Sequence, residues 1–385
     1  MPKRGAARPV CWSLPELLES PSLLMTLGAF LLLLGPLIVL HELGHYYAGR
    51  LFGVRAMTFS VGIGKELWHR IDKRGTRWRI AAVPLGGYVL FAGDADASSK
   101  PDPALADATP EQLKGTFPGA PLWQRTLIVL AGPLANLLVA VAIIAAFVAV
   151  VGIPSNPAIV TGFADNSPAR NAGLLQGDRI TAIDGNDIET FKDVATTVMI
   201  YPNRTVEVTI DRDGRSLDLP VKLGERVVTD RFGNESRLGL LGISGGDLEL
   251  RKVGPVAAIG HGFTESFAIM QTMAIGLKQI VTGERSMKEM GGPIKIAKYS
   301  GEMMSVGWLA YIEFAALISI NLAFINLLPI PTLDGGHLAM YAAEAVRRKP
   351  LGVRSQEWAF RGGMALVLGL AVFVTFNDLV SLLAK

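Results

Sequence analysis

The sequence predicts a polytopic α-helical membrane protein that carries an inserted α+β domain. Half of the residues are hydrophobic and only 18% are charged, a balance typical of a membrane protein with some soluble mass. Four segments come close to the roughly 20 apolar residues that cross a bilayer. Between the second and the third lies a stretch rich in β-forming residues and turn signals, which is too hydrophilic for a bilayer.

The elements are expected in the following order. An N-terminal segment at 1–21 has basic residues like a signal peptide, but the apolar run after it is long and lacks an evident cleavage site, so an uncleaved span is predicted. The ranges are a first transmembrane helix at 22–50, a β-rich region at 51–120, a second span at 121–153, a β-rich domain at 155–224, a linker and amphipathic helices at 225–304, a third span at 305–335, a loop at 336–357 and a fourth span at 358–384.

Basic residues gather in the region after the first span and in the loop before the fourth. The positive-inside rule places both on the cytoplasmic side, and the β-rich domain on the opposite side. Lys3, Arg4 and Arg8 count against this orientation but are fewer. The first and third spans then run in the same direction.

Composition also limits the chemistry. The formal net charge of +3, with scattered basic residues, gives no reason to expect a nucleic-acid partner, and the lipid bilayer is the expected surroundings. A single cysteine, Cys11, excludes an intramolecular disulfide framework and makes a thiolate zinc site very improbable. Any metal site must therefore use histidines and carboxylates.

The stretch "HELGH" at the end of the first span has the spacing of a zinc peptidase. His41 and His45 project from one face of a helix, where they can hold one zinc ion, and Glu42 can take a proton from water beside it. Ionisable groups at membrane depth are costly and usually functional. The alternative is that the three side chains cap the end of an apolar helix.

A catalytic zinc needs a third protein ligand, and "NLAFINLLPIPTLDGGH" offers one in Asp334. Asn321 and Asn326 are also expensive in lipid, while Pro329 and Pro331 forbid a regular helix. Broken backbone at that depth must face protein or a water-filled cavity. Because the first and third spans run in parallel, Asp334 can lie at the depth of the two histidines.

These two motifs together resemble the site-2 proteases, the intramembrane zinc metalloproteases, and most closely the bacterial group with an inserted PDZ domain that includes the regulator of sigma-E protease. The resemblance covers nearly the whole chain. It implies Zn²⁺ as cofactor, bound by His41, His45 and Asp334, with Glu42 as general base. It also implies that Asn321, Asn326, Pro329 and Pro331 hold the substrate.

Two further segments fit this family. "VPLGGYVLFAG" resembles its membrane-associated β-hairpin, in which Gly86 and Gly87 would let an unwound substrate approach and pair with the strand edge. An ordinary cytoplasmic hairpin is the alternative. "SPARNAGLLQGDRITAIDGNDI" resembles the core of a PDZ domain, and whether 225–250 holds a remnant of a second PDZ domain stays open.

The resemblance implies the second cut of regulated intramembrane proteolysis in a bacterial inner membrane. Expected substrates are single-span membrane proteins of the anti-sigma-factor type, already cut by a site-1 protease, and signal-peptide remnants. The PDZ domain would bind a ligand or the substrate's ectodomain on the outer side. The rival interpretations are a non-catalytic PDZ scaffold with structural zinc and a metal-ion transporter.

Other polar residues receive simpler interpretations. His337 is either a group that supports the site or an ordinary helix-start histidine, and His69 and His261 are expected at the surface. Glu313 is expected near the outer membrane face, where it snorkels to the interface or binds a partner rather than taking part in catalysis. Asn136 in the second span is expected to bind a neighbouring helix.

Overall fold

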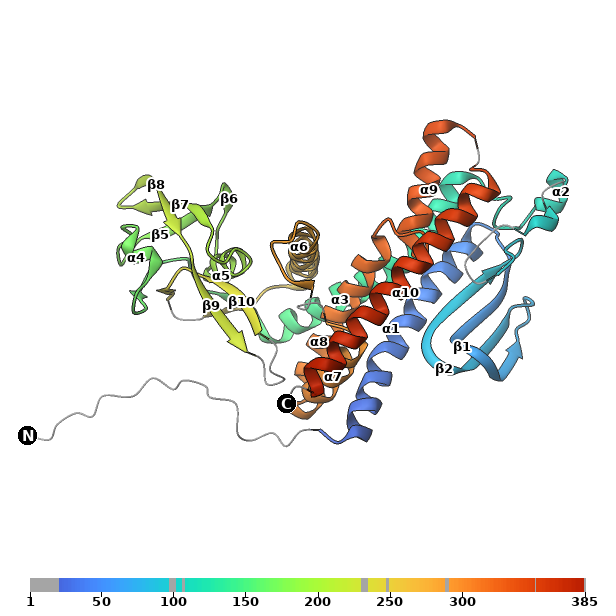
Figure 1. Ribbon diagram of the computed structural model, residues 1–385, viewed down its shortest axis with the longest axis horizontal. Helices are drawn as coiled ribbons and strands as arrows, with labels where there is room; N and C mark the ends of the chain where they lie inside the picture. Colours follow the sequence, from blue (N-terminus) through green and yellow to red (C-terminus); the bar gives the residue numbers. More distant parts are fainter. Residues whose placement is uncertain are drawn as a thin grey trace, which may run out of the picture.

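The structure, a computed structural model, describes residues 21–96, 102–105, 108–229, 235–246, 249–287, 291–349 and 351–383. Within these residues, four helices contain segments long and apolar enough to cross a membrane. They are α1 (Leu23–Leu51), α3 (Leu122–Val151), α8 (Trp308–Leu327) and α10 (Val353–Leu383), the last over Ser355–Val380. The helices form a bundle with a curled β-sheet on one flank and the inserted domain on the other (Figure 1).

The bundle is held mainly by apolar packing. Leu33 and Leu37 of α1 share a buried cluster with Tyr311 and Ile318 of α8. The Tyr311 hydroxyl donates a hydrogen bond of 2.7 Å to the carbonyl oxygen of Ala29, so this polar group has a partner inside the cluster. α1 and α8 are thereby fixed to each other along the turns of α1 that precede HELGH.

The predicted third span, 305–335, is divided in the structure. α7 (Pro293–Val306) ends before α8, α8 ends at Leu327, and a separate helix, α9 (Asp334–Arg347), begins at Asp334. Pro329 and Pro331 lie in the intervening turn, and proline has no N–H with which to continue a helix. Asp334 therefore opens a new helix rather than ending a long one.

The β-sheet lies beside α1. The first half of β1 (Ala56–Ile71) is flanked by both halves of β2 (Arg77–Phe91), because Phe59 pairs with Val89 on one side and with Trp78 on the other. β1 bends at Gly62, whose φ of +88° is open to glycine but costly for other residues. The Gly87–Phe91 end of β2 is thus brought next to α1, and η1 (Pro103–Leu105) and α2 (Pro110–Leu113) lead on to α3.

The inserted domain leaves the bundle through a two-stranded neck. β3 (Ile153–Ser155), directly after α3, pairs with β12 (Glu249–Arg251), directly before α6 (Pro255–Val281). Beyond the neck lies a four-stranded sheet in the order β6-β5-β7-β8. Its strands are β5 (Arg179–Ile183), β6 (Asn186–Asp187), β7 (Thr205–Arg212) and β8 (Arg215–Lys222), and the helices of the domain are α4 (Pro168–Asn171) and α5 (Phe191–Met199).

The inserted domain runs past the predicted boundary at residue 224. β9 (Gly224–Thr229) pairs with β10 (Glu235–Leu240), and β11 (Ile243–Ser244) pairs with β4 (Gly162–Phe163). Leu241 joins the same buried core as Val160, Ile180 and Val208. The described residues between 225 and 244 therefore complete this one domain, and are neither a linker nor a remnant of a second one.

α6 connects the inserted domain to the bundle. On the domain side, the side-chain amide of Gln279 donates to the carbonyl oxygen of Ile200 at 2.8 Å, and Lys192 Nζ lies 2.6 Å from Glu265 Oε1. On the bundle side, Ala258 shares a buried cluster with Ala145 and Val148 of α3. The amphipathic helix predicted here therefore covers the bundle.

Candidate active site

The two HELGH histidines face one point beside α1. Because they stand four residues apart, one helical turn brings both rings to the same face. Their ring centroids are 4.8 Å apart, and their Nε2 atoms are 3.2 Å apart. Both nitrogens point away from the axis of α1 toward the start of α9.

Asp334 meets the histidines from the far end of the sequence. Its Oδ2 lies 3.1 Å from His41 Nε2, and its Oδ1 lies 3.5 Å from His45 Nε2. The tight turn before α9 makes this approach possible, because a β-carbon on Gly335 would lie 2.3 Å from the carbonyl oxygens of Leu327 and Leu328. Gly335 therefore belongs to the machinery of the site, although we assigned it no role from the sequence.

The donor set fits zinc. One ligand atom from each of His41, His45 and Asp334 can be chosen so that all three lie within 4.8 Å of one another. Tetrahedral ligands at zinc-to-nitrogen bond lengths are about 3.3 Å apart, close to the observed separation of the Nε2 atoms. Asp334 Oδ2 is also buried, and its close polar neighbour is the other ligand atom, His41 Nε2, at 3.1 Å, so that both atoms can turn to one cation. Among the described residues, these three form the metal-type cluster of the chain.

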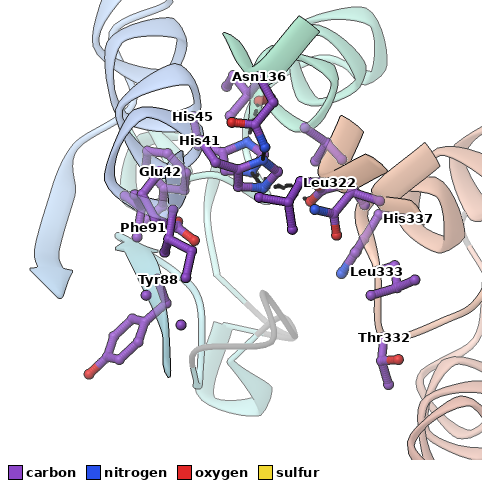
Figure 2. Close-up of a pocket in the computed structure, with 18 of the residues that line it drawn as sticks. His41, Glu42, His45, Tyr88, Phe91, Asn136, Leu322, Thr332, Leu333 and His337 are labelled. Carbon is purple, nitrogen blue, oxygen red and sulfur yellow. Dashed lines mark hydrogen bonds and ion pairs between the residues drawn. The ribbon is translucent and has the colours of Figure 1, made fainter. Parts of the chain in front are cut away.

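A cavity of about 400 Å³ opens beside this cluster. Glu42, one residue along α1 from His41, lies on its wall next to Phe91 of β2 (Figure 2). Among the other predicted residues, Gly86, Gly87 and Asn326 also line it. The cavity therefore joins the metal cluster, a carboxylate and the end of β2 that lies next to α1.

The other predicted substrate residues lie elsewhere in the structure. Asn321, Pro329 and Pro331 are not among the described residues that line the cavity. Pro331 instead packs against α10, because a β-carbon on Gly363 would lie 3.0 Å from its ring. A role in holding substrate stays a prediction for these three.

α3 supplies contacts that we did not predict from the sequence. His45 Nδ1 lies 2.9 Å from the carbonyl oxygen of Ile128, and Asn136 Nδ2 lies 3.3 Å from His41 Nδ1. Gly132 lies between them, and a β-carbon there would be 2.3 Å from His45 Nε2. The sequence signal for these contacts is a polar residue, Asn136, four residues after a glycine in an apolar span. The sequence does not show which neighbouring helix this face of α3 contacts.

The remaining histidines differ in their surroundings. His337 lines the cavity, and its ring centroid is 5.2 Å from that of Phe360 in α10. His69 is exposed on β1 and lies 2.7 Å from Glu66. His261 is half-buried on α6.

Comparison with known proteins points to one family. Residues 29–370 match the model of peptidase family M50. A relative named "Putative zinc metalloprotease" from Agrobacterium fabrum is 42% identical, over 92% of this chain and 95% of the relative. The protein named metalloprotease MmpA from Caulobacter vibrioides is 34% identical, over 92% of this chain and 96% of its own.

Solved structures similar to part of the chain are PDZ domains. Two of them, from SdrC-like proteins of Listeria monocytogenes and Listeria innocua, are 23% and 20% identical. Each match covers 25% of this chain with a TM-score of 0.19, and spans 93% and 100% of the respective solved chains.

Proposed function

Because the chain belongs to peptidase family M50 and is a zinc metalloprotease, we propose that it cuts peptide bonds within the membrane, in or near the transmembrane segments of single-span proteins. The observation that carries this proposal is the position of the cavity. Glu42 and the His41, His45 and Asp334 cluster line it between helices of a bundle long and apolar enough to cross a bilayer.

His41, His45 and Asp334 would hold the zinc ion. When bound, zinc supplies Lewis-acid activation of water and of the scissile carbonyl group. The Glu42 carboxylate takes a proton from the attacking water as the water oxygen bonds to the carbonyl carbon. Glu42 then delivers this proton to the amide nitrogen as the carbon–nitrogen bond breaks, so the products are a carboxylic acid and an amine.

The end of β2 is suited to hold an unwound substrate. A helical substrate has its scissile carbonyl hydrogen-bonded internally, so it must unwind before attack. Gly86, Gly87 and Tyr88 line the same cavity as Glu42, and a strand edge offers backbone groups that replace the lost hydrogen bonds. The Asn326 side chain, which lines the same cavity, is a further candidate partner.

We further propose a bacterial inner-membrane location, with the β1–β2 sheet on the cytoplasmic side and the inserted domain outside. The basic residues of β1 and β2 and of the loop before α10 support this orientation. In this arrangement the inserted domain, acting as a PDZ module, admits single-span substrates that another protease has already trimmed. Anti-sigma-factor-type proteins and signal-peptide remnants are the proposed classes.

Activity with a defined substrate tests the proposed chemistry. Wild-type protein and Glu42→Gln are reconstituted in lipid vesicles with a single-span substrate, and bound zinc is quantified in both. We expect equal zinc, with cleavage by Glu42→Gln lower by about 10²- to 10⁴-fold, the usual contribution of a general base. Equal cleavage by the two proteins would rule out Glu42 as the base. Zinc binding without cleavage by either protein would instead indicate a non-catalytic scaffold.

Removal of the inserted domain tests the selection of trimmed substrates. Replacing residues 157–246 by a short flexible linker keeps the β3–β12 neck and therefore the exits of α3 and α6. We expect the shortened protein to cleave both untrimmed and trimmed substrates, whereas the full chain cleaves the trimmed one. Unchanged selectivity of the shortened protein contradicts a filtering role.

A further inference from the structure

The side chain of Asn136 lies fully buried in the middle of α3 with an unsatisfied acceptor. Its Nδ2 is placed 3.3 Å from His41 Nδ1, while its Oδ1 has no hydrogen-bond partner among the described residues. Buried amide oxygens nearly always accept a hydrogen bond. The orientation of this amide therefore needs a physical account.

The tautomer of His41 gives that account. His41 Nε2 faces Asp334 and His45, so it is the nitrogen whose lone pair is available to a metal. A neutral imidazole with an unprotonated Nε2 carries its proton on Nδ1, which must then donate. An amide NH₂ group cannot accept that proton, but the amide oxygen can.

Rotation of the Asn136 amide by half a turn resolves the conflict. The oxygen and nitrogen of an asparagine amide have nearly the same shape, and their assignment follows from the hydrogen-bond network. With the two exchanged, Oδ1 occupies the position 3.3 Å from His41 Nδ1. The buried oxygen then has a donor and the His41 Nδ1–H has an acceptor.

The same face of α3 also holds the second histidine. Ile128, Gly132 and Asn136 are spaced four residues apart, so they lie along one stripe of the helix. The Ile128 carbonyl oxygen is the partner of His45 Nδ1, at 2.9 Å. At Gly132 a β-carbon would lie 2.3 Å from His45 Nε2 and 2.9 Å from His41 Cε1, so only a glycine lets α3 approach this closely.

We propose that Asn136 is a positioning residue whose Oδ1 accepts the Nδ1–H of His41, and that Gly132 provides the space in which both histidines are held. Each histidine is thereby fixed in the tautomer that presents Nε2 to the metal. Partners of this kind orient metal ligands and increase metal affinity. The inference rests on the proposed assignment of His41 and His45 as zinc ligands.

Zinc affinity of the purified full-length protein in detergent tests this role. Four variants are compared with the wild type: Asn136→Leu, of similar size but without an acceptor; Asn136→Asp, which keeps an acceptor oxygen; Gly132→Ala; and Ser319→Ala. Ser319 Oγ donates to the backbone oxygen of Asn136 at 2.7 Å, so its loss weakens the contact between α3 and α8 but leaves the Asn136 amide in place. Affinity is measured by competition with a chelator, and folding by thermal unfolding of the metal-free protein.

We expect Asn136→Leu and Gly132→Ala to bind zinc about 10- to 100-fold more weakly. Asn136→Asp is expected to stay within a few-fold of the wild type, and Ser319→Ala to be unchanged in zinc affinity. A purely structural Asn136 would lower the unfolding temperature without changing zinc affinity, and that result overturns the proposal. If Asn136→Leu does not fold, Asn136→Ala takes its place, with the same expected loss.

The outcome is separable from that of the proposed function. Zinc affinity is measured without a substrate, so it responds to Asn136 even if no substrate is cleaved. His41→Ala provides the reference, because the proposed function requires it to lose zinc. Normal zinc affinity in His41→Ala contradicts the assignment of the ligands, whereas normal affinity only in Asn136→Leu and Gly132→Ala contradicts the positioning role.

Discussion

Gly87 of β2 lies directly against Glu42 of α1. A β-carbon added at Gly87 would be 3.1 Å from Glu42 Cγ and 2.8 Å from the carbonyl oxygen of Ser60. The strand backbone and the proposed base therefore share one wall of the cavity with no side chain between them. This contact connects the sheet to the chemistry and makes the position sensitive to small changes.

Gly87→Ala is expected to lower kcat/KM by about 10- to 100-fold, because a displaced strand or carboxylate misaligns the reacting groups. Zinc content should stay at the wild-type level, since Gly87 does not touch the metal cluster. Ala82→Ser, at an exposed position of the same strand, is the matched control. Peptide cleavage in detergent checks the prediction, and wild-type kcat/KM in Gly87→Ala would contradict it.

Gly335→Ala is expected to remove zinc and activity together. The added methyl group would meet the carbonyl oxygens of Leu327 and Leu328 at 2.3 Å, which pushes Asp334 away from the histidines. Gly369→Ala in α10 adds a methyl group into open space and serves as the control. Metal analysis after purification decides the matter, and full zinc occupancy in Gly335→Ala argues against this account of the turn.

Removal of the metal should be reversible in the wild type and in a ligand variant, but the variant should need more zinc to recover. We expect a strong chelator to abolish cleavage and added Zn²⁺ to restore it. Asp334→Asn, with one weaker ligand oxygen, should need much higher zinc for the same recovery. A zinc titration of both proteins measures the difference, and identical recovery curves would exclude Asp334 as a ligand.

Asp178 is expected to stabilise the inserted domain in a pH-dependent way. Its carboxylate is 2% exposed and receives bonds of 2.7 and 2.8 Å from Arg212 and one of 2.7 Å from the Leu175 N–H. Burial alone would raise the pKa of Asp178, but the bonds from Arg212 and Leu175 hold it below its usual value. Because the folded pKa lies below the unfolded one, the stabilisation is complete above the unfolded value and is lost as pH falls through the folded value.

Asp178→Asn should therefore destabilise the domain at neutral pH by about 2 kcal/mol, the usual contribution of a hydrogen bond to a charged group, because the Arg212 side chain left without its partner is 28% exposed and can be hydrated. The difference from the wild type should shrink in acid. Lys192→Ala, which removes a pair whose lysine is 58% exposed, should cost less than about 1 kcal/mol. Hydrogen exchange of the β7 amides reports both changes, and a pH-independent difference for Asp178→Asn would contradict the linkage.

Residue types and periodicity predict part of the transmembrane fold and of the candidate site. The first span was predicted at 22–50 and α1 occupies Leu23–Leu51, because a continuous apolar run has no other stable form in lipid. The prolines before Asp334 correctly indicated broken backbone, but not that a new helix begins at Asp334 itself. That detail depends on how Gly335 packs against the end of α8.

Features that depend on contacts between distant parts of the chain could not be predicted from the sequence. The strands between 235 and 244 belong to the inserted domain only through pairing with β9 and β4, which no local pattern encodes. The roles of Gly132 and Asn136 depend on the rotation of α3 about its axis. An apolar helix with little asymmetry leaves that rotation undetermined by sequence, so Asn136 was assigned to helix packing.

The separation of the ligands along the chain has a consequence for biogenesis. His45 and Asp334 are about 290 residues apart, and α3, the inserted domain and α8 are all made between them. A nascent chain therefore holds an incomplete ligand set until α8 and the start of α9 have entered the membrane. With the proposed ligands and substrates, we expect the protease to stay inert during most of its own synthesis, so that neighbouring spans at the insertion machinery are spared until the last helices arrive.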